Sequence, residues 1–195
     1  IEAVARLVKR MCRDAEVAAE AIVEAVVVGN TAMHHLFAGM PVRQLGFMPY
    51  VPAVSSAVTF RAREVGLRLA PAANVYMPPN IAGFVGADHV AMLRATRAYE
   101  ADRPTVALDI GTNTEITLAA DGRLLACSCA SGPAFEGAHI RDGMRAAPGA
   151  VEQVVLRDGQ AHVATVGGQP PVGLCGSGIL DAVAELFDHG LLERS

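Results

Sequence analysis

The sequence predicts an α/β fold in which a β–α half precedes a β–β–β–α half, and three observations support this order. Apolar runs rich in valine, such as residues 22–28, are typical of buried strands. Apolar residues at helical spacing, as in 87–98, indicate helices. Asp-Gly pairs between short apolar runs are typical of hairpins, and they occur only in the second half.

The first half contains three expected helices and two expected strands. Residues 1–20 show helical spacing, and 22–28 form the first strand. Gly29 follows that strand, and Asn30 or Thr31 is the expected cap of a helix over 33–37. The remaining expectations are a mainly irregular segment over 39–60, a strand over 74–77 and a helix over 87–98.

The second half is expected to contain a three-stranded meander, a hairpin and a helix. The meander strands are 105–110, 115–119 and 124–129, and residues 134–144 are compatible with a short helix. The hairpin strands 151–156 and 161–166 flank Asp158-Gly159, and the last helix covers 179–192. Asp102-Arg103-Pro104 resembles a linker, so we divide the chain into two parts, 1–103 and 104–195.

The composition excludes several classes of protein. The 195 residues are 52% hydrophobic and 18% charged, which argues against a disordered tail or a charged coiled coil. With 16 basic and 20 acidic residues, the net charge is −4, so the basic excess of a general nucleic-acid binder is absent. No apolar run reaches the roughly 18 residues that predict a membrane span.

The two ends and the cysteines indicate whether the chain is part of a longer protein and in which compartment we expect it. Both ends fall within helical patterns, so we expect a fragment of a longer protein. Residues 1–10 lack the apolar core of a signal peptide, and the 4 cysteines are too sparse for a disulfide framework. We therefore expect a cytoplasmic protein.

The segment between the first two meander strands is suited to bind a phosphate. A buried strand carries Asp109 near its carboxyl end, and Gly111 permits a turn with positive φ. Thr112 and Asn113 offer short polar side chains beside backbone N–H groups, which can wrap a phosphate. Asp109 would hold a hydrated Mg²⁺ rather than contact the phosphate directly. The alternative is an ordinary hairpin turn with a buried aspartate.

Several segments together resemble a known family. DIGTNTEI (109–116) resembles the phosphate-binding hairpin of the actin, sugar-kinase and heat-shock-chaperone ATPases. A wider set, which covers about residues 20–192, resembles the reductive activators of corrinoid-dependent methyltransferases. This set is VVVGNTAMHHLFAGM (26–40), GFVGADHVA (83–91), ALDIGTNTEI (107–116), ASGPAFEGAHIRDGMRAAPGAV (130–151) and GLCGSGI (173–179).

The resemblance implies a ribonuclease-H-like actin/sugar-kinase ATPase fold of which the chain holds only part. Residues 1–103 would be the end of the first lobe, and 104–195 the start of the second. In the family, ATP and Mg²⁺ bind between the lobes. ATP helps to deliver an electron that returns the cobalt of a partner's corrinoid from Co(II) to Co(I). The implied partner is a corrinoid protein or its methyltransferase.

The resemblance also assigns roles to individual residues. Asp109, Gly111, Thr112 and Asn113 match the second phosphate hairpin of the family. Gly83, Gly86 and Asp88 match the connection between the lobes. The first phosphate hairpin and the adenosine-binding segment have no counterpart in the chain, and the family's [2Fe–2S] region would lie upstream. We therefore expect half an ATP site, with ATPase activity in the full-length protein rather than in this fragment.

Two further glycine-rich segments are candidates for the nucleotide site. Ser131 and Gly132 could line the cleft, and Glu136 could act as a catalytic carboxylate that orients water or faces the metal. The alternative for this segment is a turn that caps a following helix. Gly176 and Ser177 precede the last helix, where a helix N-terminus suits an anion. The alternative there is close contact between helix and sheet, with neighbouring Cys175 in the core.

The histidines and the remaining cysteines carry weaker signals. His34 and His35 are adjacent in a helix and diverge by about 100°, so we expect one to be packed and one exposed. Cys127 and Cys129 share one face of a strand, but no second cysteine pair completes a metal site.

Two other functions stay open at this stage. A small-molecule kinase needs a carboxylate that accepts a hydroxyl proton, for which Glu115 or Glu136 is available. A non-enzymatic docking module would need no nucleotide. The apolar composition also favours a homodimer, with the strands around 20–30 and 105–130 as the expected contact.

Overall fold

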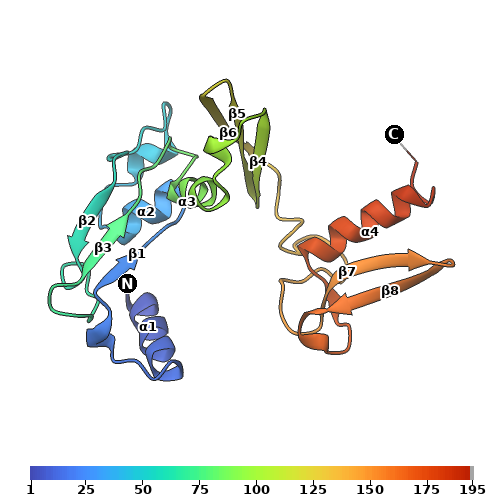
Figure 1. Cartoon of the computed structure of the whole chain (residues 1–195), viewed down its shortest axis with the longest axis horizontal. Helices are drawn as coiled ribbons and strands as arrows, with labels where there is room; N and C mark the ends of the chain where they lie inside the picture. Colours follow the sequence, from blue (N-terminus) through green and yellow to red (C-terminus); the bar gives the residue numbers. More distant parts are fainter. Residues whose placement is uncertain (194–195) are drawn as a thin grey trace. The chain divides into compact units, whose positions relative to one another are not determined.

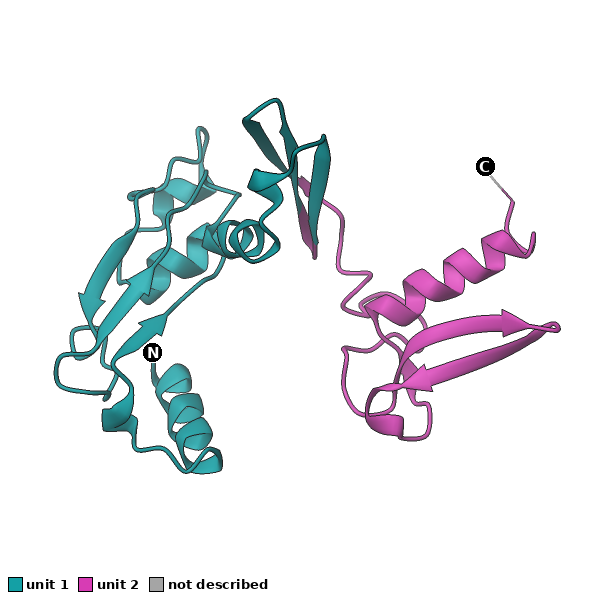
Figure 2. Ribbon diagram, viewed as in Figure 1, with its two compact units in different colours: residues 1–109, 115–128 teal, residues 110–114, 129–195 magenta. Residues whose placement is uncertain are grey.

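The computed structural model describes residues 1–193 (Figure 1). These residues form two compact units (Figure 2). Unit 1 contains residues 1–109 and 115–128, and unit 2 contains 110–114 and the residues from 129 onward. None of the helices within residues 1–193 is long and apolar enough to cross a membrane.

A three-stranded mixed sheet forms the centre of unit 1. Its order is β1-β3-β2, where β1 (Glu24–Val26) is parallel to β3 (Asn74–Met77) and β2 (Val58–Arg61) is antiparallel to β3. Val75 and Met77 alternate inward along β3 and are fully buried against Ala62, Leu67 and Ala73. The predicted strand over 74–77 is confirmed.

The predicted buried strand over 22–28 is shorter and more exposed than expected. Only Glu24–Val26 forms a strand, and Val26 is 60% exposed. The reason is its place in the sheet, because β1 pairs only with β3 in the described structure and so forms an edge. An apolar run alone does not distinguish an edge strand from a central one.

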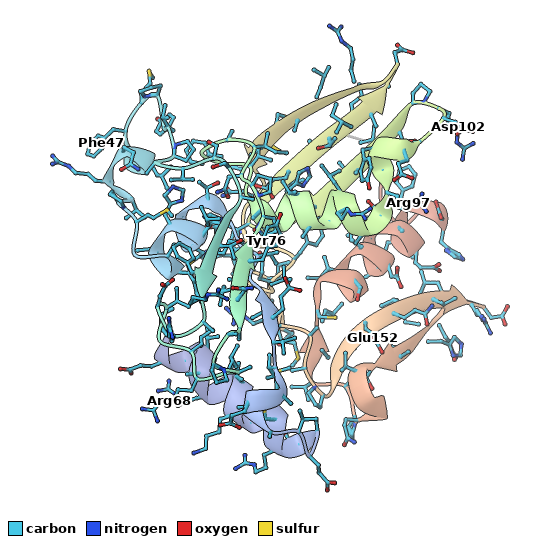
Figure 3. All side chains as sticks on the ribbon, turned by 60° about the vertical axis from the view of Figure 1, so that its left-hand side comes forward. Phe47, Arg68, Tyr76, Arg97, Asp102 and Glu152 are labelled. Carbon is cyan, nitrogen blue, oxygen red and sulfur yellow. The ribbon has the colours of Figure 1, made fainter. Side chains whose placement is uncertain are left out.

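Three α-helices and three short 3₁₀ segments complete the first part of unit 1. The α-helices are α1 (Glu2–Asp14), α2 (Thr31–Phe37) and α3 (Ala87–Thr96), and the 3₁₀ segments are η1 (Ala19–Ala21), η2 (Arg43–Gly46) and η3 (Ala98–Glu100). Asn30 caps α2, because its side-chain Oδ1 accepts a hydrogen bond from the backbone N of Met33 at 2.9 Å. Figure 3 marks Arg97, where α3 ends in left-handed backbone.

The predicted meander is present, and its turns explain its direction. Its strands β4 (Thr105–Ile110), β5 (Asn113–Ala120) and β6 (Arg123–Ala130) are neighbours in that order. Two residues connect each pair, and connections this short join antiparallel strands. Asp121 and Gly122 both adopt positive φ, as the predicted hairpin turn requires.

Unit 2 contains a hairpin covered by one helix. Strand β7 (Ala150–Arg157) is antiparallel to β8 (Gln160–Thr165) and parallel to the short β9 (Gly173–Leu174). A short 3₁₀ segment, η4 (Val166–Gly168), follows β8. Helix α4 (Gly176–Asp188) packs on β7, where Asp181 and Glu185 accept hydrogen bonds from backbone N–H groups of the strand. The helix begins three residues earlier than the predicted 179–192.

Residues 134–144 form consecutive turns rather than a short helix, so that interpretation is wrong. Gly137, His139 and Asp142 all adopt positive φ, which interrupts right-handed helical backbone. In addition, the backbone of Gly137 approaches Gly143 and Met144 so closely that neither glycine leaves room for a Cβ. The segment folds back on itself instead of winding into a helix.

Candidate functional site

The residues between β4 and β5 form the core of the candidate site. Gly111 does not adopt the positive φ that the sequence analysis assigned to it. A Cβ at this position would lie 3.2 Å from the carbonyl O of Asn113 and 3.9 Å from Oε1 of Glu136. The glycine therefore avoids a tight contact with the backbone of Asn113, and it is not needed for left-handed backbone.

Glu136 lies beside this turn and is bound by it. Thr112 donates a hydrogen bond from Oγ1 to Oε1 of Glu136 at 2.8 Å. The second carboxylate oxygen, Oε2, is buried and has no hydrogen-bond partner in the described structure. No helix follows Glu136, so the helix-capping alternative for this segment is excluded. One oxygen of the carboxylate is fixed, and the other is a buried acceptor without a partner in the described structure.

Ser131 and Gly132 join the same turn from the end of β6. Their backbone N–H groups donate to the carbonyl O of Thr112 at 3.0 and 2.9 Å. The Ser131 hydroxyl donates to Oγ1 of Thr114 at 2.7 Å, and Thr114 is buried. The structure thus brings Gly111, Thr112, Ser131, Gly132 and Glu136 together, although they come from separated parts of the sequence.

Asp109 and Asn113 border the turn along the chain. Asp109 is half-buried near the end of β4, on the face opposite the exposed Val106 and Leu108. Asn113 is the exposed first residue of β5. Asp109 belongs to unit 1 and the turn belongs to unit 2. The joint role of Asp109 and the turn in binding phosphate and Mg²⁺ therefore stays a prediction.

The start of α4 approaches the segment that carries Glu136. A Cβ on Gly176 would lie 2.6 Å from the carbonyl O of Phe135, the residue before Glu136. A Cβ on Gly178 would come even closer to the carbonyl O of Val151 in β7. The close helix–sheet contact is therefore present, and the anion-binding alternative for Gly176 and Ser177 stays a prediction. Cys175 is buried and donates to the carbonyl O of Val151, as expected of a core residue.

These groups define what the site can do chemically. Hydroxyl groups and a carboxylate with one free oxygen surround a turn that carries little side-chain bulk. Magnesium is commonly held through one or two carboxylates while it keeps several waters. Within the described residues, no group of three or more His, Cys, Asp or Glu side chains could hold a metal ion. The arrangement suits an oxygen-rich anion with a hydrated cation.

Sequence reasoning missed a buried polar cluster in unit 1. We expected one of His34 and His35 to be exposed, but they are 1% and 0% exposed, so that prediction is wrong. Ring nitrogens of His35 bond to the carbonyl O of Thr31 and the backbone N of Val54, and Nε2 of His34 lies 3.2 Å from the carbonyl O of Pro78. The helix buries the face that carries Thr31, His34 and His35, whereas Met33 and Leu36 are exposed. No local signal indicated this burial, because the residues that cover the histidines, Val54 and Pro78, lie far away in the sequence.

A cavity of about 520 Å³ lies elsewhere in unit 1, between α1, η1 and the loop that carries Arg68. Arg68 is labelled in Figure 3. Its lining includes Arg6, Lys9 and Arg68 together with apolar side chains, and none of the predicted site residues. The candidate site is therefore not this cavity.

Comparison with protein families divides the chain close to the predicted linker. A family profile described as the RACo middle region matches residues 1–101. A second profile, described as the C-terminal domain of RACo, the ASKHA domain, matches residues 103–195. Thr112, Ser131, Glu136 and Gly176 all fall within the second match.

Individual relatives agree with these profiles. The chain is 34% identical over 194 residues to the corrinoid activation enzyme RamQ of Eubacterium limosum, covering 100% of the chain and 32% of that protein. It is 27% identical over 224 residues to a [Co(II) methylated amine-specific corrinoid protein] reductase of Methanosarcina barkeri, covering 99% and 42%. A solved reductive activator for corrinoid, iron–sulfur protein matches with a TM-score of 0.86 and 40% identity, covering 97% of the chain and 31% of that structure.

Proposed function

The chain belongs to the RACo family, and on this premise we propose that it is part of an ATP-dependent reductive activator of a corrinoid protein. The whole protein would return the cobalt of that partner from Co(II) to Co(I), which adds one electron. Two relatives are named for corrinoid activation and for reduction of a Co(II) corrinoid protein. The chain spans about a third of the length of RamQ, so the activity is proposed for the full-length protein.

One observation carries the nucleotide part of the proposal. The Thr112 hydroxyl holds Glu136 beside a glycine turn, within the region that matches the ASKHA profile. We propose that the backbone N–H groups of Gly111, Thr112 and Asn113 donate hydrogen bonds to phosphate oxygens. Asp109 would hold Mg²⁺ through water, and Glu136 would orient a water molecule with its free oxygen. When bound, ATP supplies the free energy for an electron transfer that is otherwise uphill.

The remaining parts of the proposal concern the surroundings of the site. Residues 1–103 and 104–195 would belong to successive lobes, and the ASKHA profile begins at residue 103. The electron would come from a [2Fe–2S] region upstream of this chain. We propose a cytoplasmic location, and contact with the corrinoid protein or with its methyltransferase. Each of the two kinase candidates accepts one hydrogen bond through Oε1, Glu115 from Ser128 at 3.0 Å and Glu136 from Thr112 at 2.8 Å.

The test is Asp109→Asn in the full-length protein, with Asp121→Asn as a matched control. Asp121 lies in the other turn of the same meander, where its left-handed backbone also suits asparagine. We expect Asp109→Asn to abolish Mg²⁺-dependent ATP turnover and Co(I) formation while circular dichroism stays unchanged. Metal-mediated stabilisation is worth several kcal/mol of barrier. Normal turnover in a folded Asp109→Asn protein would refute the role of this carboxylate.

A further inference from the structure

A buried hydrogen bond joins α3 to β5 in unit 1. Nε2 of His89 lies 2.6 Å from Oγ1 of Thr117, and the two residues are 0% and 1% exposed. His89 lies in α3, and Thr117 lies near the middle of β5. Both positions are closed to water, so the bond faces no competition from solvent and its geometry is fixed.

The two partners come from different regions of the family. His89 falls within residues 1–101, matched by the middle-region profile, and Thr117 falls within residues 103–195, matched by the ASKHA profile. In the described part of unit 1, this is the side-chain hydrogen bond that spans the boundary between the two regions. It therefore fixes one strand of the ASKHA region against a helix of the middle region.

The bond is not the arrangement that stability alone would favour. Nδ1 of His89 is buried and has no partner in the described structure. Leaving a buried polar group without a hydrogen bond lowers stability, whereas an apolar pair of similar shape would avoid that cost. A specific interaction at a fixed position explains the histidine better than packing does.

Both ends of the bond continue into elements that can transmit a displacement. Strand β5 begins at Asn113, directly after the Gly111-Thr112 turn. At the other end, α3 begins against α2, since a Cβ on Gly86 would lie 2.6 Å from Cα of Asn30. The backbone N of Asp88 also donates to the carbonyl O of Gly29 at 3.3 Å. Helix α3 is thus held near its start by the segment before α2 and, through His89, by β5.

From these contacts we infer that His89 is a positioning residue that couples the strand after the phosphate turn to the middle region. A change in the turn on nucleotide binding would shift β5, and Thr117 would carry that shift to α3. This inference rests on the proposed function and adds to it the route by which the nucleotide state reaches the middle region.

The test compares isosteric variants of Thr117 in the full-length protein. Thr117→Val keeps the side-chain volume but removes the hydroxyl, and Thr117→Ser keeps the hydroxyl. Thr105→Val is the matched control, because the Thr105 hydroxyl, at the start of β4, donates to the nearby carbonyl O of Arg103 and not across the boundary between the regions. For each protein we would measure the KM for ATP, the rate of ATP-dependent Co(I) formation in the corrinoid partner, and the Tm.

We expect Thr117→Val to slow Co(I) formation about tenfold while the KM for ATP stays within about threefold, a loss typical of coupling between sites. Thr117→Ser should keep a rate close to that of the wild type. The double variant with His89→Leu and Thr117→Val should form Co(I) no more slowly than Thr117→Val alone. A lower Tm with an unchanged rate would mean that the bond is only structural and would overturn the inference. If the wild-type protein itself forms no Co(I) with ATP, the proposed function fails, and this inference fails with it.

Discussion

Thr112 Oγ1 donates a hydrogen bond to Glu136 Oε1 at 2.8 Å, across 24 residues of sequence. The contact joins the turn after β4 to the irregular segment after β6, and it fixes one of two carboxylate oxygens. A carboxylate held in this way presents its other oxygen in a defined direction. The contact therefore fixes the orientation of the Glu136 carboxylate, which the sequence alone does not show.

The first prediction concerns this contact. Thr112→Val in the full-length protein should lower the kcat of ATP turnover by about tenfold or more, because a hydrogen bond to a charged group contributes roughly 1.5–3 kcal/mol. Thr112→Ser keeps the hydroxyl and should retain most of the activity. Steady-state phosphate release measures both. A loss in Thr112→Ser with normal activity in Thr112→Val would show that the methyl group, rather than the hydrogen bond, matters.

A second prediction compares two glycines in unit 2. Gly132 and Gly137 both have positive φ, but a Cβ meets nothing within 4 Å at Gly132, whereas at Gly137 it would overlap the backbone of Met144. Gly132→Ala should therefore lower the free energy of unfolding by about 1 kcal/mol through backbone strain alone. Gly137→Ala should lower it by clearly more, and by enough to expose residues 129–193 to proteolysis.

Urea unfolding followed by circular dichroism, with limited proteolysis, measures both glycine effects in the 195-residue chain. Similar midpoints for the two variants would contradict the close packing of Gly137 on Gly143 and Met144.

A third prediction follows from the buried histidine pair. Burial, and the charge of the neighbouring His35, lower the pKa of His34, against an opposing hydrogen bond to the carbonyl O of Pro78. The unfolded chain, with a pKa of about 6.5, therefore binds a proton that the folded chain resists. The free energy of unfolding should fall as the pH drops below about 6.5 and should be level above it.

His34→Gln isolates this effect, because glutamine does not titrate and can still donate to the Pro78 carbonyl. The variant should show a flatter dependence of the urea midpoint on pH between about 5 and 8 than the wild type. His162→Gln is the control, since His162 is exposed on β8. A wild-type slope that persists in His34→Gln would place the pH sensitivity elsewhere.

The sequence predicted those elements that depend on local chemistry. Asp121-Gly122 and Asp158-Gly159 both adopt the positive φ that their hairpins need, and the strand over 74–77 has the predicted bounds. Asn30 caps α2 through a contact three residues away. Each of these signals involves neighbours along the chain, so it can be seen without the tertiary structure.

The features that the sequence did not predict depend on tertiary contacts. His34 and His35 are both buried because segments around Val54 and Pro78 cover them, and nothing near the histidines indicates this. Glu136 was a candidate, but its partner Thr112 lies 24 residues away. The buried bond between His89 and Thr117 spans 28 residues and escaped the sequence analysis completely. The lobe assignment of 1–103 and 104–195 stays a prediction.

The last prediction concerns association of the isolated 195-residue chain. Val106 and Leu108 are 58% and 52% exposed on one face of β4, which forms an edge of the β4-β5-β6 order. An exposed apolar edge strand invites pairing with another chain, and charged residues on such an edge prevent it. We therefore expect the chain to self-associate at micromolar concentration, and Val106→Lys with Leu108→Lys to make it monomeric. Val163→Lys, on the similarly exposed β8, should leave association unchanged. Sedimentation velocity measures all three, and a monomeric wild-type chain would refute the homodimer that we propose.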